Sequence, residues 1–195
     1  MPRIDAPTVA EHRAIVRERL IDAAEQLLRS GQPEGLTAGA VTKAAGIARN
    51  SIYRYVDSVD DLPALVLERH LPAWTRAVDE ALAGVTEPGE RIRRWVRANI
   101  DQAALTGHGW MMNAARTWKV SPAVQPVMDA AHASMRDVVG DAWHELTADE
   151  ATAQASAALT RGLLESAFRQ VDAGADPDLV ARVSDRAVRG LLSQT

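Results

Sequence analysis

Six side chains whose chemistry suits nucleic acids lie within one short segment of the chain. Arginine and asparagine form paired hydrogen bonds with the edges of guanine and adenine. Serine and tyrosine hydroxyls bind phosphate oxygens and fix a protein's register on DNA. Both tyrosines of the chain lie in this segment, which contains Arg49, Asn50, Ser51, Tyr53, Arg54 and Tyr55. These residue types together indicate a surface that contacts duplex DNA.

A short helix that turns these side chains outward would position them. Thr37 can cap a first short helix that ends at residues 44–46, and Gly46 can adopt the positive φ of a tight turn. A following helix over residues 49–56 would face its own core through a small apolar set: Val41, Ala45, Ile47, Ile52 and Val56. Two helices joined in this way are typical of a helix-turn-helix unit. A solvated amphipathic helical hairpin is the alternative.

The segment from Arg19 to Leu67 resembles the DNA-binding domain of the TetR family of bacterial transcriptional regulators. The family pattern is Ala-Gly-Val-Ser-x-Gly-Thr-Leu-Tyr-x-Tyr-Phe, followed by Ser-Lys, two acidic residues and Leu. Residues 45–56 of this chain read AGIARNSIYRYV, and residues 58–62 read SVDDL. The resemblance implies that Thr37, Ser51, Tyr53 and Tyr55 contact the DNA backbone. It implies sequence reading by Arg49, Asn50 and Arg54.

Three departures from the family pattern bear on DNA contacts. Ala48 replaces a serine that often caps the recognition helix or touches DNA. Asn50 replaces a small glycine and adds a polar side chain at the base edges. Val59 replaces a lysine that commonly binds phosphate. Lys43 and the arginines at positions 13, 17 and 19 could supply part of that charge.

Composition and charge are those of a globular protein with a mildly basic head. The 195 residues are 47% hydrophobic and 25% charged, and they include no cysteine, which excludes disulfides and thiol chemistry. The overall net charge is −4, but residues 1–56 hold eight Lys/Arg against six Asp/Glu. The first seven residues have no apolar core and no apolar run reaches the length of a membrane span, so we expect a cytoplasmic protein without a signal peptide.

Helical periodicity covers nearly the whole chain and predicts an all-α fold of roughly nine helices. Further helix starts are marked by Ser58–Asp61, Ser121-Pro122, Thr147–Glu150 and Asp176-Pro177. Pro63 would delete a hydrogen bond in a helix that began at Ser58, so we expect this helix to begin at Asp60. We expect two domains, a three-helix DNA-binding domain over residues 1–57 and a larger ligand-binding and dimerisation domain over residues 58–195.

The second domain holds all five tryptophans and four of the five methionines. Large aromatic and pliable methionine side chains around a few polar groups are typical of sites for apolar ligands. They also fill ordinary cores, which is the alternative. The candidate ligand-binding residues are Trp95, Asn99, Trp110, Met111, Asn113, Trp118, Met128, His132 and Met135.

Two apolar stripes near the end of the chain predict a dimer interface. The second stripe is wide enough to meet both its own core and a partner. Two helices from each chain would form a four-helix interface, as in TetR-like proteins. The candidate interface residues are Leu159, Leu163, Phe168, Val180, Val183, Ala187 and Leu191. An intrachain helix pair is the alternative.

No motif supports enzymatic chemistry or a metal site. The five histidines show no metal-ligand spacing, and nucleotide-binding and nucleophile-elbow motifs are absent. We therefore expect a homodimeric repressor without a cofactor, bound to a palindromic DNA operator and released by a small apolar or aromatic effector. A constitutive DNA-binding regulator and, less well supported, an all-α ligand-binding protein or enzyme are the alternatives.

Overall fold

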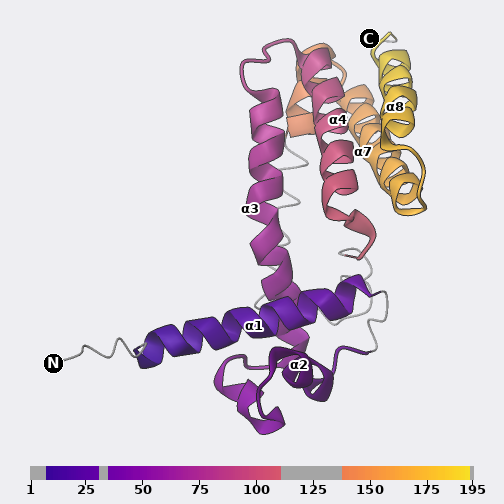
Figure 1. Cartoon of the computed structure of the whole chain (residues 1–195). Helices are drawn as coiled ribbons and strands as arrows, with labels where there is room; N and C mark the ends of the chain where they lie inside the picture. The colour runs from indigo at the N-terminus through magenta and orange to yellow at the C-terminus, as the bar shows by residue number, and fades with distance from the viewer. Residues whose placement is uncertain (1–7, 31–34, 111–137, 194–195) are drawn as a thin grey trace, which may run out of the picture. The chain divides into compact units, whose positions relative to one another are not determined.

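The computed structural model describes residues 8–30, 35–110 and 138–193 (Figure 1). Every regular element in these ranges is an α-helix or a short 3-10 helix, which confirms the expected all-α class for this part of the chain. The described residues form two compact units, which divide after Arg69, within helix α3 (Leu62–Leu82); Trp110 groups with the first unit. The boundary expected after residue 57 remains a prediction.

The first unit is a small helical domain with one continuous core. It contains α1 (Val9–Arg29), α2 (Ala38–Ala45), η2 (Arg49–Arg54), η3 (Val59–Asp61) and the first residues of α3. Helix α1 packs against α2, and α2 packs against η2. Four large side chains at the centre of the core, Leu20, Val41, Ile52 and Leu62, are fully buried. Burial of these side chains holds η2 against α1 and α2.

Side-chain caps define the helix starts in the first unit. The Thr37 hydroxyl accepts a hydrogen bond from the Ala40 amide at 3.2 Å, which confirms the expected cap of α2. Ser58 and Asp61 form the expected capping box, but it opens the 3-10 turn η3, and α3 begins at Leu62. The expected start at Asp60 was therefore two residues early. Pro63 becomes the second residue of α3, where a missing N–H breaks no helical hydrogen bond.

The second unit packs three long helices side by side: α4 (Pro88–Thr106), α7 (Glu150–Asp172) and α8 (Pro177–Leu192) (Figure 1). Small buried residues let these helices approach closely, among them Ala153 and Ala157 of α7 and Ala181 and Ser184 of α8. The remainder of α3 and a helical stretch over residues 138–146 complete the unit.

Three helix starts are expected after residue 100: Ser121-Pro122 lies outside the described residues, one of the other two is confirmed and one is corrected. Asp176 caps α8 and Pro177 is its first residue, as expected. The cap of α7 is Asp149 rather than Thr147, because the helix begins only at Glu150. The Asp149 carboxylate accepts the Thr152 amide at 2.9 Å, and a negative charge there suits the helix N-terminus. Thr147 instead accepts the Asp149 amide.

Two buried tryptophans in the second unit have their indole N–H groups satisfied by buried polar side chains. Trp74 Nε1 donates to Asn99 Oδ1 at 2.9 Å, and Asn99 Nδ2 donates to the Trp95 carbonyl at 2.8 Å. Trp143 Nε1 donates to the Thr160 hydroxyl at 3.0 Å. Because a buried donor without a partner is costly, these bonds specify how α4 and α7 face their neighbours.

Asn99→Ala should lower the free energy of unfolding by about 2–3 kcal/mol, because it strands the Trp74 N–H in the core and leaves a cavity. Urea denaturation followed by circular dichroism measures the loss. In a Trp74→Phe background the same substitution should cost about 1 kcal/mol less, since no indole N–H is then stranded. Equal losses in both backgrounds would show that the hydrogen bond contributes nothing.

No helix in the described ranges combines the length and the apolar character that a membrane crossing requires. The same residues contain no group of three or more His, Asp or Glu side chains placed to hold a metal ion.

Candidate nucleic-acid interface

Helix α2 and the turn after it provide a rigid support for the segment that follows. Val41, Thr42 and Ala45 are buried, and the Thr42 hydroxyl donates to the Ala38 carbonyl at 2.6 Å, so no polar atom of this face is stranded. Gly46 has φ +69° and ends the helix in the left-handed conformation. A residue with a Cβ is strained there, which explains why glycine occupies the turn.

The segment after the turn sorts its side chains between core and solvent as the sequence predicts. Ile52 is fully buried and Val56 is 6% exposed, so both contribute to the core. Tyr53 is 62% exposed, an unusual state for an aromatic ring. The exposed face further contains Arg49, Asn50 and Arg54, whereas Ser51 and Tyr55 are half-buried. Burial of Ile52 and Val56 therefore fixes the segment so that its polar face is exposed to solvent.

The segment is a 3-10 helix of six residues rather than the expected α-helix to Val56. Ala48 occupies its N-cap position and offers no side-chain hydrogen bond, in line with the departure from the family pattern. An α-type bond from the Val56 amide to the Ile52 carbonyl closes the last turn at 3.2 Å. A 3-10 run of this length is uncommon, because its hydrogen-bond geometry is poorer than that of an α-helix.

Arg13 of α1 holds the C-terminal end of this segment, a contact that sequence reasoning missed. Its Nη2 atom donates to the Arg54 carbonyl at 2.7 Å. A cationic side chain at the C-terminal end of a helical segment donates to an unpaired carbonyl and is attracted by the partial negative charge there. The two residues are 41 positions apart, so no local pattern could have revealed the pair.

Arg69 of α3 ties α3 to α1 through three carboxylates of α1. Its guanidinium lies 2.6 Å from Glu18, 2.6 Å from Asp22 and 3.4 Å from Glu25. Partial burial opposes the charged form of Arg69, but the hydrogen bonds with Asp22 and Glu18 raise its pKa above the ordinary value. These three carboxylates are engaged with Arg69, whereas Lys43, Arg49 and Arg54 are exposed and available to an anionic partner.

Similar proteins are found by sequence over part of the chain and by structure over nearly all of it. No protein-family model matches the chain. Two uncharacterized HTH-type transcriptional regulators from two strains of Mycobacterium tuberculosis are 32% identical to it over 83 residues. The match covers 43% of this chain and 41% of each relative, so the chain spans about two fifths of the length of the curated relatives it matches.

Solved structures match over nearly the whole chain. A TetR-family transcriptional regulator from Streptomyces coelicolor superposes with a TM-score of 0.70 at 18% identity and covers 93% of this chain and 96% of its own. The chain has the TetR fold. AibR, solved with isovaleryl coenzyme A and operator DNA, matches with a TM-score of 0.68 at 15% identity over 88% of this chain and 96% of its own. A Saccharomonospora viridis protein solved with choline matches with a TM-score of 0.70 at 14% identity over 90% and 96%.

The described part of the TetR-like chain places the candidate ligand-binding residues in different surroundings. Trp95 and Asn99 are buried in the second unit, and both amide atoms of Asn99 form hydrogen bonds within the core. Trp110 packs against the core of the first unit, with the Arg29 guanidinium 4.5 Å from its ring. The other candidates, Met111, Asn113, Trp118, Met128, His132 and Met135, lie outside the described residues. A site formed by this set remains a prediction.

The candidate dimer residues divide between the core and the surface of the second unit. Phe168 and Val180 are buried within the chain, and Phe168 contacts the rings of Trp74 and His108. Leu159 is 60% exposed and Val183 is 48% exposed, which is high for large apolar side chains. Ala187 is also exposed, and Leu163 and Leu191 are half-buried. Leu179 belongs to the same predicted apolar stripe, although it is not among the candidate interface residues, and it is 48% exposed on the same face of α8 as Val183.

Proposed function

We propose that this chain is a TetR-type regulator of transcription that reads a specific DNA sequence through η2. The observation that carries the proposal is that residues 49–56 bury their apolar side chains and expose most of their polar ones. Ile52 and Val56 anchor it in the core, while Arg49, Asn50 and Tyr53 face solvent. Arginine and asparagine read base edges in the major groove, and tyrosine binds phosphate oxygens. Local similarity to HTH-type regulators supports the same function.

The regulator acts as a homodimer on a palindromic operator. Helices α7 and α8 expose large apolar side chains, among them the predicted interface residues Leu159 and Val183. Such side chains are costly to leave in water and suit a helical interface with a second copy of the chain. A two-fold dimer presents two copies of η2 to successive major grooves about 34–36 Å apart. Each copy would then read one half of an inverted repeat.

We infer that the regulator is a repressor that a small apolar or aromatic effector releases from DNA. Two proteins of this fold bind small molecules, since AibR was solved with isovaleryl coenzyme A and operator DNA and the Saccharomonospora viridis protein was solved with choline. If the effector binds better to a form whose two reading segments no longer fit the operator, ligand and DNA oppose each other reciprocally. We assign the chain no enzymatic activity and no cofactor.

A second candidate function, a constitutive DNA-binding regulator, is favoured by one observation. Both amide atoms of Asn99 are hydrogen-bonded within the core, so Asn99 offers no free polar group to a ligand in this conformation. Tryptophan fluorescence during titration with a library of hydrophobic compounds separates the two candidates. An effector shifts the fluorescence and releases labelled operator. If no compound does either, the constitutive function is the correct one.

DNA binding itself is tested by the fluorescence anisotropy of labelled duplexes titrated with the full chain. We expect binding that weakens as salt is raised, because Lys and Arg contacts release counterions from DNA. A matched titration with the Arg49→Ala/Arg54→Ala variant should show a large loss of affinity. Equal affinity of the wild type and this variant would show that η2 does not contact DNA.

A further inference from the structure

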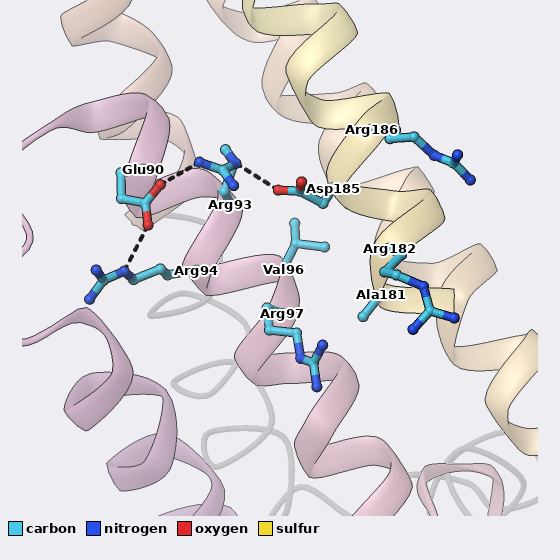
Figure 2. A pocket seen from close by; sticks show the side chains of 9 residues that line it. All are labelled: Glu90, Arg93, Arg94, Val96, Arg97, Ala181, Arg182, Asp185 and Arg186. Atoms are coloured by element: carbon cyan, nitrogen blue, oxygen red, sulfur yellow. Dashed lines mark hydrogen bonds and ion pairs between the residues drawn. The ribbon is translucent and has the colours of Figure 1, made fainter. Parts of the chain in front are cut away.

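A groove of about 510 Å³ lies between α4 and α8, entirely within the second unit (Figure 2). Its volume falls in the range of small-molecule sites. None of the residues predicted from the sequence to bind DNA, an effector or a second chain is part of its lining. The lining residues are Glu90, Arg93, Arg94, Val96, Arg97, Ala181, Arg182, Asp185 and Arg186.

The groove has an excess of positive charge, because five arginines and only two carboxylates line it. Glu90 accepts from both Arg93 and Arg94, at 2.6 and 2.9 Å. Asp185 accepts from Arg93 at 2.6 Å and also from Arg189, which lies outside the lining. The two carboxylates are thus fully engaged with part of the arginine set.

Two arginines of α8 provide the remaining charge. Arg182 and Arg186 are exposed, and neither forms a hydrogen bond or an ion pair with any residue in the described ranges. They are four residues apart on one helix and therefore lie on the same face. Arg97, across the groove on α4, pairs at 2.7 Å with Asp178, which does not line the groove.

The floor between the arginines is apolar and firmly packed. Val96 of α4 is 2% exposed and Ala181 of α8 is 4% exposed. Figure 2 shows Val96 and Ala181 where the two helices face each other, with Arg97 and Arg182 close by, while Arg94 and Arg186 extend outward at the two sides. A ligand that fits this arrangement has negative groups at its periphery and a compact body that lies on the floor.

We propose that this groove binds a small organic anion with at least two negative charges, of the phosphorylated or polycarboxylate class. Guanidinium groups bind phosphate and carboxylate oxygens with paired hydrogen bonds, and all five basic residues of the lining carry this group. The carboxylates of Glu90 and Asp185 disfavour the continuous phosphate backbone of duplex DNA along the same groove. The site is independent of DNA binding by η2.

Calorimetric titration of the full chain with inorganic tripolyphosphate and with citrate tests the proposal, at low and at raised ionic strength. We expect at least one probe to bind, with an affinity that falls as salt is raised. Binding of tripolyphosphate alone assigns the phosphorylated class, and binding of citrate alone assigns the polycarboxylate class. If neither probe binds at low ionic strength, the groove is not an anion site.

Two pairs of variants distinguish a defined site from diffuse attraction. Arg182→Gln/Arg186→Gln should weaken anion binding by about tenfold, since it removes two solvent-exposed ion pairs between the protein and the bound anion. The same arginines replaced by lysine keep the charge but lose the planar fork, so an intermediate loss is expected. The matched control Arg161→Gln/Arg169→Gln changes the net charge equally on α7, outside the lining. An unchanged affinity in the first variant, or an equal loss in the control, would overturn the proposal.

Discussion

Arg49→Ala should weaken binding to the cognate operator by about 1–3 kcal/mol and relax base preference at one position in each half-site. The reason is that Arg49 is exposed at the start of η2, where its guanidinium can form paired hydrogen bonds with guanine. Quantitative binding to a panel of single-base operator variants measures both effects. Circular dichroism shows whether the fold is kept, which the exposure of Arg49 predicts.

Tyr53→Phe should behave differently in the same panel. It removes only a hydroxyl that would bind phosphate, so affinity should fall by a similar factor for every sequence and base preference should stay the same. Arg76→Ala is the matched control for Arg49→Ala, because Arg76 is an exposed arginine of α3 in the second unit. If Arg49→Ala and Tyr53→Phe change sequence preference in the same way, the division between reading and anchoring residues is wrong.

Leu159→Glu or Val183→Glu should convert the proposed dimer into a folded monomer and reduce operator affinity by about 10²–10⁴-fold. A carboxylate in an apolar interface is costly to desolvate, and a monomer binds only one half-site. Both side chains are exposed in the protomer, so the core of the second unit is undisturbed. Analytical ultracentrifugation and operator titration measure the two effects.

Gln170→Glu is the matched control for the dimer variants. It places the same charge at an exposed polar position of α7 and should leave both the sedimentation coefficient and operator affinity unchanged. If Leu159→Glu and Val183→Glu both stay folded and sediment as the wild type does, the dimer does not form through α7 and α8.

Local patterns were sufficient to predict three features of the first unit. The cap at Thr37, the positive φ at Gly46 and the burial of Ile52 each depend on residues within one or two helical turns. The cap of α7 was misplaced because Thr147 and Asp149 are both good capping residues, and sequence does not show which one the packed helix selects. The short 3-10 form of η2 was missed for a similar reason, because helical periodicity does not separate the two helix types.

Contacts between distant residues could not be predicted. The bond from Arg13 to the Arg54 carbonyl and the three carboxylates around Arg69 join positions more than 40 residues apart. The same limit applies to Asn99, which the sequence marked as a ligand contact because it is polar among apolar residues. The structure shows its amide between Trp74 and the Trp95 carbonyl, a role that depends on how α3 packs against α4.

Selection of bound duplexes from a random DNA pool by the purified full chain, at moderate salt, tests the central claim most directly. The account predicts enrichment of one inverted repeat whose half-sites are about one helical turn, or a multiple of it, apart. The Arg49→Ala variant should enrich the same repeat with one position relaxed in each half-site. Recovery of no common sequence by the wild-type chain would contradict the claim that η2 reads DNA.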